Sequence, residues 1–215
     1  LGVVGPVRTG KSTFIKRFME LVVLPEMSDE NEKARTIDEL PQSATGKTIM
    51  TTEPKFIPKS GAEIHFPNQE TGRIRLIDCV GFLVPGAVGN EEGEKERMVK
   101  TPWSEQEIPF SEAAAMGTRK VISDHSNIGI VVTTDGSFGD IPADNYKGAE
   151  EKTVLECKKA GKPFIILLNT SNPQSAGTKE LAEQMAEKYG KIVLPVNGKE
   201  MNREEALNIM EQILS

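Results

Sequence analysis

Residues 5–12, Gly-Pro-Val-Arg-Thr-Gly-Lys-Ser, fit the phosphate-loop pattern G-x-x-x-x-G-K-[ST] and constrain the fold of this chain more than any other segment. The apolar residues 1–4 before the loop predict a buried parallel strand, and residues 13–24 after it carry apolar side chains at helical spacing. The pattern has meaning only between a strand and a helix, and this chain supplies both. The alternative, a glycine-rich turn that merely joins the two elements, does not account for the lysine and the hydroxyl at the required places.

The loop predicts a site for the phosphates of a nucleotide. Backbone N–H groups of the loop and of the first helical turn converge on one concavity, where they donate to phosphate oxygens. Lys11 adds a positive charge at the terminal phosphates, and the Ser12 hydroxyl is a candidate ligand of Mg²⁺. The residues predicted to contact the nucleotide here are Gly5, Arg8, Thr9, Gly10, Lys11, Ser12 and Thr13, and for Arg8 the alternative of contact with a neighbouring molecule stays open.

A second phosphate element follows an apolar strand. Residues 76–81, Leu-Ile-Asp-Cys-Val-Gly, place Asp78 at the end of that strand, where a carboxylate holds Mg²⁺, usually through a water. Gly81 has no side chain to obstruct a γ-phosphate, so its backbone N–H is a predicted donor. The alternative is a polar strand end followed by an ordinary turn.

A threonine segment, residues 46–54, lies between the two motifs. In switch-type nucleotide hydrolases such a threonine closes over Mg²⁺ and the γ-phosphate, and it therefore senses the triphosphate. Thr51 or Thr52 is expected to do this, and Thr48 fits less well. The predicted catalytic residues are therefore Lys11, Asp78, Thr51 and Thr52, and the predicted metal ligands are Ser12, Thr51 and Asp78.

Apolar strands alternate with helical segments along the chain, which predicts an α/β fold of three layers, a P-loop NTPase with a mostly parallel sheet. The expected strands are residues 54–57, 62–66, 73–78, 128–133, 164–168 and 192–195, and the expected helices are residues 111–125, 146–160, 178–189 and 202–214. We predict a turn at residues 58–61, a polar stretch at 25–52 and an irregular segment at 82–110. The order of phosphate loop, threonine segment and Asp-x-x-Gly matches the translation-factor-like GTPases of the TRAFAC class.

The segment expected to read the base departs from that class. Such GTPases read guanine with Asn/Thr-Lys-x-Asp after a central strand, whereas residues 169–172 are Asn-Thr-Ser-Asn. Asn169 is retained, but Asn172 replaces the aspartate, and an amide cannot accept two hydrogen bonds from guanine because one of its ends is itself a donor. The hydrogen-bonding edge of guanine would be left unpaired, which lowers the affinity for guanine nucleotides. We therefore predict Asn169 and Asn172 as nucleotide contacts and adenine as the base.

Residue 82 is a second departure. Many GTPases place a glutamine after the Asp-x-x-Gly glycine to orient the attacking water, and this chain has Phe82. An apolar side chain cannot hold a water by hydrogen bonds. Thr51, Thr52 or a partner must therefore orient the attacking water, or the attack proceeds slowly. Slow turnover suits a one-time conformational switch better than a metabolic enzyme.

Composition argues against two other classes. The 215-residue chain has a formal net charge of −6, whereas broad nucleic-acid binding needs a basic face. No apolar run approaches the ~20 residues that cross a bilayer, and no secretory signal is visible. We therefore expect a cytoplasmic protein in which Cys79 and Cys157 are reduced. Because the chain opens with Leu1 directly in a strand, we expect it to be a fragment of a longer protein.

Several strings together resemble the stage IV sporulation protein A family. They are residues 2–20, 38–43, 46–56, 78–81, 101–103, 108–110 and 133–136, and the likeness runs from the first residue to about Asn169 and weakens beyond it. The resemblance implies an ATPase that uses ATP and Mg²⁺, with Lys11 as the phosphate-loop lysine, Asp78 as the Mg²⁺-side acid, and Thr51 and Thr52 as sensor threonines. It also implies that residues 1–215 are the P-loop ATPase domain, without the middle and C-terminal domains of the family.

The resemblance further implies that ATP hydrolysis drives self-assembly into a static polymer, the basement layer of the spore coat around the forespore, in the mother-cell cytoplasm. The partners would be further copies of the protein, other spore-coat morphogenetic proteins and a small membrane-anchor protein. Nucleic acid would not be a partner, and this part of the chain would not insert into a membrane directly. Two alternatives stay open: a GTPase switch, and a nucleotide-binding structural protein without hydrolysis, which Phe82 favours.

Overall fold

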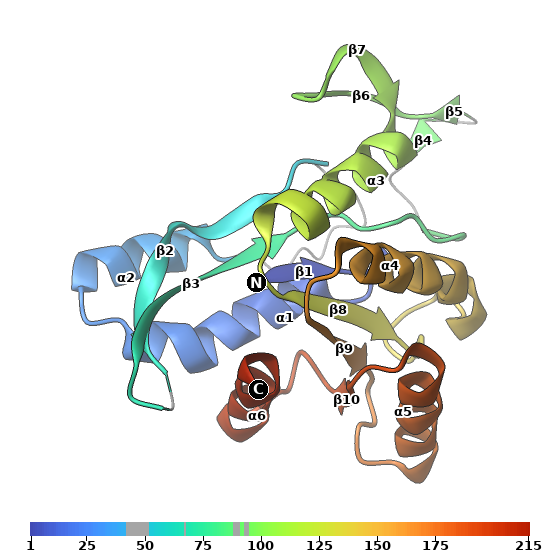
Figure 1. Ribbon diagram of the computed structural model, residues 1–215. Helices are drawn as coiled ribbons and strands as arrows, with labels where there is room; N and C mark the ends of the chain where they lie inside the picture. The colour runs from blue at the N-terminus through green and yellow to red at the C-terminus, as the bar shows by residue number, and fades with distance from the viewer. Residues whose placement is uncertain (42–51, 67, 88–90, 93–94) are drawn as a thin grey trace.

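A six-stranded sheet lies at the centre of the fold (Figure 1). The computed structural model describes residues 1–41, 52–66, 68–87, 91–92 and 95–215, with the backbone alone at 91–92 and 95–96. The strands of the central sheet are β1 (Gly2–Val4), β2 (Lys55–His65), β3 (Thr71–Asp78), β8 (Gly129–Thr134), β9 (Phe164–Asn169) and β10 (Val193–Val196). They lie in the order β10-β9-β8-β1-β3-β2, and every neighbouring pair is parallel except β2 and β3.

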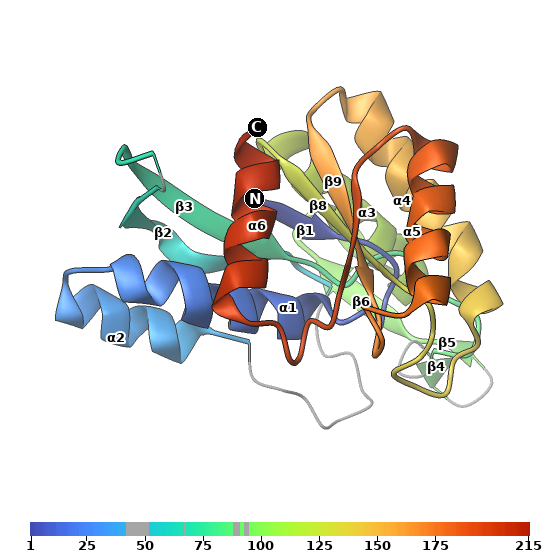
Figure 2. The same ribbon diagram turned by 90° about the horizontal axis from the view of Figure 1, so that it is seen from below.

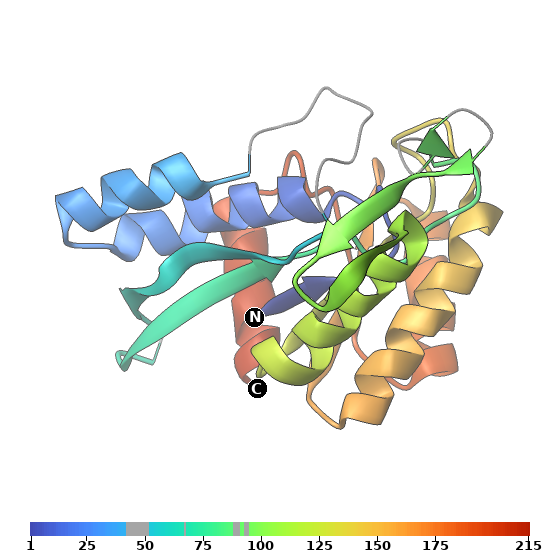
Figure 3. The same ribbon diagram turned by 90° about the horizontal axis from the view of Figure 1, so that it is seen from above.

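Helices cover both faces of this sheet, so the predicted three-layer α/β fold is confirmed. They are α1 (Lys11–Phe18), α2 (Glu30–Glu39), α3 (Phe110–Lys120), α4 (Lys147–Ala160), α5 (Ala176–Tyr189) and α6 (Arg203–Leu214). One face carries α1 and α6, with α2 beside α1 (Figure 2). The other carries α4, α5 and the π-helical turn Val121–His125 that continues α3, and Figure 3 shows α3 and α4 side by side. None of the helices within the described ranges is long and apolar enough to cross a membrane.

Side-chain alternation along the central strands separates two apolar clusters. In β8, Ile130 and Val132 pack with α1 and α6, whereas Val131 packs with α4 and α5. All six residues of β9 are buried, because a parallel strand covered on both faces has no side that faces solvent. The near-continuous apolar runs in the sequence therefore predicted these central strands correctly.

Strand β2 runs through the segment predicted to be a turn. The expected two short strands around residues 58–61 are instead one strand of 11 residues, paired with β3 on both sides of that segment. Between the paired residues Ile57 and Ala62, four residues of β2 lie opposite Arg75 alone. Pro58 and Gly61 therefore lie in a bulge of one continuous strand, and the predicted turn was wrong.

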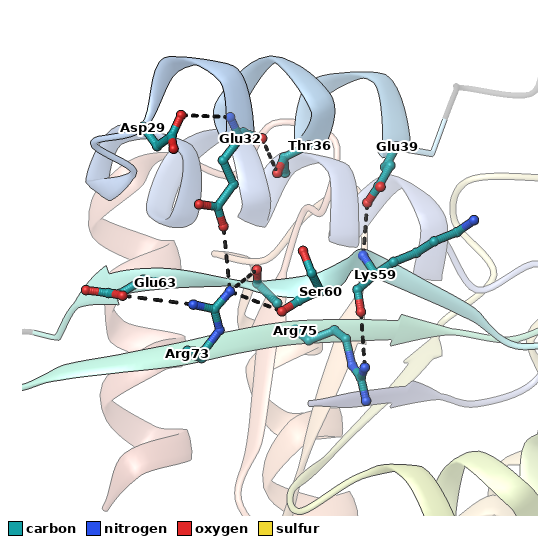
Figure 4. A network of polar contacts seen from close by, with 10 residues as sticks. Asp29, Glu32, Thr36, Glu39, Lys59, Ser60, Glu63, Arg73 and Arg75 are labelled. Carbon is teal, nitrogen blue, oxygen red and sulfur yellow. Dashed lines mark hydrogen bonds and ion pairs between the residues drawn. The ribbon is translucent and has the colours of Figure 1, made fainter.

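Two arginines of β3 hold this bulge in place (Figure 4). Arg73 donates to the Gly61 carbonyl oxygen at 3.0 Å, and Arg75 donates to the Lys59 carbonyl oxygen at 3.2 Å. The Lys59 N–H donates to the Glu39 carboxylate at 3.0 Å, which ties the bulge to the end of α2. Backbone groups that a bulge removes from the ladder are thus satisfied by side chains from other elements.

Helix α2 lies in the stretch that we predicted to be only polar. Asp29 caps it by accepting the N–H groups of Asn31 and Glu32 at 2.9 and 3.1 Å. Thr36 within the helix and Leu40 directly after it are buried, so this side of the helix faces the core. An aspartate followed three residues later by a glutamate was the local signal for this helix start.

Two further segments differ from the prediction. α1 ends at Phe18, and the chain continues as a π-helical turn, Met19–Val23, and a 3₁₀ turn, Leu24–Glu26, in place of one helix over residues 13–24. The segment predicted to be irregular, residues 82–110, contains two hairpins that project beyond α3 in Figure 1. These hairpins pair β4 (Glu91–Glu92) with β5 (Lys95–Glu96), and β6 (Met98–Thr101) with β7 (Ser104–Pro109).

The two cysteines are buried free thiols, which agrees with the expected reduced state. Burial raises the pKa of Cys79 to about 11 and that of Cys157 to about 12. Both side chains therefore stay protonated and apolar at neutral pH, and they pack in the cluster that α4 and α5 share.

A buried carboxylate joins three elements on one face of the sheet. Glu150 of α4 accepts the hydroxyl of Thr133 in β8 and, at 2.7 Å, the hydroxyl of Tyr189 at the end of α5. Burial raises the pKa of Tyr189, and the bond to Glu150 raises it further, so the phenol remains a donor. Because each carboxylate oxygen has a partner, the polar group is tolerated in the interior.

We predict that Glu150→Ala lowers the free energy of unfolding by about 2–4 kcal/mol, because the hydroxyls of Thr133 and Tyr189 lose their acceptor inside the protein. Urea unfolding followed by circular dichroism measures the change. Glu151→Ala at the next position of α4 is the matched control. Its ion pair with Lys188 is half exposed, so its loss is expected to cost less than about 1 kcal/mol. Equal effects of the two substitutions would contradict the role given to Glu150.

Candidate nucleotide-binding site

The predicted phosphate motifs meet at one edge of the sheet. β1 is the parallel neighbour of both β3 and β8, and β8 is the parallel neighbour of β9, so the carboxyl ends of all four strands lie together. In open α/β sheets, ligands bind outside this edge. The loop that leaves β1 enters α1 at Lys11, as the phosphate-loop pattern requires.

The phosphate loop has positive backbone φ angles at three positions. They are +143° at Gly5, +59° at Arg8 and +93° at Gly10. A Cβ on Gly5 would lie 2.1 Å from the Val132 carbonyl oxygen, and one on Gly10 would lie 2.4 Å from Asn169 Nδ2. Only glycine fits at these two positions, and left-handed residues in such a loop turn successive N–H groups to one side, as in anion-binding nests.

Lys11 lies beneath the loop. Its side chain is buried, and Nζ donates to the carbonyl oxygens of Pro6 at 2.6 Å and Gly5 at 3.3 Å. Burial lowers the pKa of Lys11, and the nearby Cys79 and Asp78 oppose that shift. The lysine thus places a positive charge at the centre of the loop, where phosphate oxygens would be stronger partners than neutral carbonyls.

The predicted metal-side groups Ser12 and Asp78 are in direct contact. Ser12 Oγ donates to Asp78 Oδ2 at 2.6 Å, and the Cys79 N–H donates to Asp78 Oδ1 at 2.9 Å. Burial raises the pKa of Asp78, while the Ser12 hydrogen bond and the charge of Lys11 lower it. A hydroxyl beside a carboxylate is the kind of oxygen donor set that Mg²⁺ uses together with substrate phosphates and waters. No group of three or more His, Cys, Asp or Glu side chains forms a separate metal cluster in the described part of the chain.

Gly81 lies directly against the phosphate loop. A Cβ at this position would be 1.9 Å from the Gly5 carbonyl oxygen and 2.9 Å from Lys11 Nζ, and the residue has a φ of +94°. Both the space and the backbone conformation therefore demand glycine. The segment after β3 is thereby brought beside the Lys11 ammonium, as the predicted contact with a γ-phosphate requires.

Phe82 packs into an apolar cluster with α4. It is 4% exposed, and its neighbours in the cluster include Val7 and Tyr146. Lys152 Nζ lies 4.7 Å from the centroid of its ring, and the Val7 N–H donates to the Phe82 carbonyl oxygen at 2.9 Å. The backbone after Gly81 is thus hydrogen-bonded to the phosphate loop, and the side chain of Phe82 packs against α4.

Internal hydrogen bonds hold the segment predicted to contact the base. Asn169 Nδ2 donates to the Thr9 carbonyl oxygen at 2.9 Å, and Asn169 Oδ1 accepts the Gly198 N–H at 3.0 Å. With both ends of its amide engaged, Asn169 positions the phosphate loop against the loop after β10. Asn172 is exposed in the loop that follows β9, where its side chain donates to Ser171 Oγ at 3.1 Å.

Asp135 lies in this region but is not among the residues predicted to contact the nucleotide. It follows β8, and its Oδ2 accepts the Thr170 hydroxyl at 2.6 Å while its Oδ1 accepts the Ser137 hydroxyl at 2.6 Å. Thr170 is fully buried and stands where the guanine-reading motif has lysine. The carboxylate therefore fixes the loop after β9. Its place just after the carboxyl end of a central strand was the available signal.

The predicted threonines take different places. Thr13 is exposed on the first turn of α1. Thr52 is buried with its backbone against α3, where a Cβ on Gly117 would come 2.6 Å from the Thr52 carbonyl oxygen. Among the described residues, Thr52 makes no hydrogen bond to the phosphate loop. Thr51 lies outside the described residues.

Comparisons with known proteins agree with the geometry. A family model described as "Stage IV sporulation protein A, ATPase domain" matches residues 1–215, so the match continues past Asn169, where the sequence resemblance was expected to weaken. Proteins named stage IV sporulation protein A from Bacillus subtilis (strain 168), Clostridioides difficile (strain 630) and Bacillus anthracis are 52%, 51% and 50% identical to this chain. The alignments cover 100%, 100% and 99% of this chain, which spans 44%, 44% and 43% of the length of those relatives.

We predict that Gly81→Ala weakens ATP binding at least about tenfold and lowers the thermal midpoint, because the methyl group cannot be placed without moving Gly5. Calorimetric titration with ATP and thermal unfolding measure the two effects. Gly177→Ala in α5 is the control: a Cβ there meets nothing within 4 Å, and alanine favours a helix by up to about 1 kcal/mol. A Gly81→Ala chain that binds ATP like the control would show that this close contact is dispensable.

Proposed function

The chain belongs to the stage IV sporulation protein A family, in whose proteins it corresponds to the ATPase domain, and from that premise we propose that it binds ATP with Mg²⁺ and hydrolyses it to ADP and phosphate. The observation that carries the proposal is the arrangement around Lys11. The buried ammonium lies inside the phosphate loop, the Gly81 backbone lies against it, and the Ser12–Asp78 pair lies nearby. These groups are the ones that phosphoryl transfer needs at the β- and γ-phosphates.

Each group has a proposed role in the reaction. The N–H groups of the loop and Lys11 bind the phosphates and offset the charge that develops as the γ-phosphoryl group leaves. Ser12 and Asp78 would hold Mg²⁺, which would supply positive charge that offsets the charge of the phosphates. Gly81 offers its backbone N–H to the γ-phosphate without a side chain in the way. Thr51 and Thr52 stay the proposed sensors of that phosphate.

We infer that the base is adenine. The position that reads guanine with a carboxylate in related GTPases is Asn172, and an amide presents a donor where guanine needs an acceptor. The loop around it is held by the bond from Thr170 to Asp135, so the lysine of the guanine-reading motif has also been replaced by an internal contact. Both changes support a base pocket that does not select guanine.

In the whole protein, we propose that hydrolysis drives self-assembly into a static polymer that forms the basement layer of the spore coat. The polymer would lie at the outer surface of the forespore, in the mother-cell cytoplasm. Its partners would be further copies of the protein, other coat morphogenetic proteins and a small membrane-anchor protein. This chain spans less than half of its relatives' length, so the assembly surfaces are proposed for the whole protein.

A second candidate function is nucleotide binding without hydrolysis. The buried position of Phe82 favours it, because the residue after Gly81 holds no water. In that case ATP would act as a structural ligand that stabilises the fold by binding.

We predict that the chain releases phosphate from ATP slowly and that removal of Mg²⁺ with a chelator stops the release. Lys11→Ala should mainly lose affinity for ATP, whereas Asp78→Asn should keep binding ATP and lose turnover, because the first removes a phosphate contact and the second a metal-side oxygen. A phosphate-release assay and equilibrium binding separate the two effects. Lys179→Ala, an exposed lysine on α5, is the control and should match the wild type. ATP binding without phosphate release would favour the second candidate function.

We predict that ATP displaces a labelled ATP analogue at least about 100-fold more effectively than GTP does, since an unpaired base edge is strongly rejected. Asn172→Asp should reduce the preference for ATP over GTP, because it restores the acceptor that guanine needs. Asn68→Asp, in the turn between β2 and β3, adds the same charge far from the site and should change nothing. Tight GTP binding by the wild type would overturn the adenine assignment.

A further inference from the structure

Arg8 has an uncommon backbone conformation inside the phosphate loop. Its φ is +59°, in the left-handed region where the Cβ of any residue but glycine crowds the backbone. Within the ranges that the structure describes, Gln69 is the only other residue besides glycines with a positive φ. A large charged side chain thus occupies a strained position, and such positions cluster at functional sites.

Contacts around Arg8 fix this conformation through the backbone. The Tyr146 hydroxyl donates to the Arg8 carbonyl oxygen at 3.4 Å, and the Val7 N–H donates to the Phe82 carbonyl oxygen at 2.9 Å. Val7 and Thr9 on either side are buried, whereas Arg8 itself is exposed. The Tyr146 contact uses the main-chain carbonyl of residue 8, so glycine at this position would keep that contact with less backbone strain.

The proposed reaction gives an exposed arginine in the phosphate loop a chemical role. Negative charge shifts between the phosphate oxygens as the γ-phosphoryl group is transferred, and an arginine supplied in cis or in trans stabilises that charge in related hydrolases. Phe82 is buried in an apolar cluster, so the residue directly after Gly81 brings no polar side chain to the reacting atoms. Lys11 and Arg8 are the two cations of the loop 5–12, and Arg8 is the exposed one.

We propose that Arg8 is a catalytic residue for ATP hydrolysis, with its guanidinium on the phosphate oxygens of the nucleotide bound by the same chain; this inference rests on the proposed function. In the step, a water oxygen forms a bond to the γ-phosphorus. The bond from that phosphorus to the bridging oxygen breaks, its electron pair stays on ADP, and the water proton passes to solvent. The guanidinium stabilises the charge on the bridging and γ-phosphate oxygens, and its planar fork lets it contact two of them at once.

Arg8→Gly tests the proposal because glycine keeps the left-handed backbone. We expect ATP affinity to stay within about tenfold of the wild type and the thermal midpoint to stay equal or rise. Single-turnover hydrolysis at saturating ATP should slow at least about 100-fold, since arginine in this role contributes about 10³–10⁵-fold. Arg8→Lys should recover little of the rate, because lysine lacks the planar fork.

Three further measurements separate this role from a general effect of surface charge, from a structural role and from action between chains. Arg35→Ala removes an exposed positive charge from α2 and should hydrolyse ATP like the wild type. ADP with aluminium fluoride, which mimics the transferring phosphoryl group, should bind the wild type tightly and Arg8→Gly weakly, while ADP alone binds both equally. The rate per chain should not change on dilution, because the arginine acts within its own chain.

Each contrary result has a definite meaning. Wild-type hydrolysis in Arg8→Gly would overturn the inference and leave the proposed function intact. A rate that falls on dilution, or that mixing Arg8→Gly with Lys11→Ala restores, would assign the arginine to a neighbouring copy and overturn the action within one chain. A lower thermal midpoint of Arg8→Gly, with full activity in Arg8→Lys, would make the residue structural. No phosphate release from the wild type would overturn the proposed function itself.

Discussion

The close contact between the Gly5 carbonyl and Gly81 is the constraint on which the rest of the site depends. β1 and β3 are parallel neighbours, so the loops that leave them pass each other at one edge of the sheet. The passage leaves no room for a side chain, since a Cβ on Gly81 would lie 1.9 Å from the Gly5 oxygen. Because both residues are glycine, the two backbones meet beside Lys11, and the same approach brings Asp78 to Ser12.

This close approach places the opposite charges of Lys11 and Asp78 near each other in a largely buried site. Burial lowers the pKa of Lys11 and raises that of Asp78, and each charge opposes the shift of the other. Charges in such surroundings interact strongly and are costly to leave unpaired. A triphosphate and a divalent cation suit this site because they bring the negative oxygens that Lys11 lacks and the positive charge that Asp78 lacks. The chemistry of the proposed ATPase therefore follows from where the two loops are forced together.

Helix α4 and the turn before it contact both Arg8 of the phosphate loop and Phe82, the residue after Gly81. The hydroxyl of Tyr146, just before α4, donates to the Arg8 carbonyl oxygen, and Lys152 within the helix lies over the ring of Phe82. One helix thus supports both the strained residue of the phosphate loop and the packed residue after Gly81. In our proposal the guanidinium of Arg8 stabilises the charge that develops on the phosphate oxygens, so catalysis depends on the phosphate loop itself.

The sequence by itself determined the phosphate loop at residues 5–12, the Asp-x-x-Gly segment and the central strands, because each of these depends on neighbours along the chain. It misread Gly61 as part of a turn, since the Arg73 side chain that holds this bulge comes from another strand. It also passed over Asp135, whose partner Thr170 lies 35 positions away and meets it only because β8 and β9 are adjacent. Tertiary structure alone decided these contacts, because hydrogen bonds between strands depend on the order and register of the sheet, and no local pattern of residues records either.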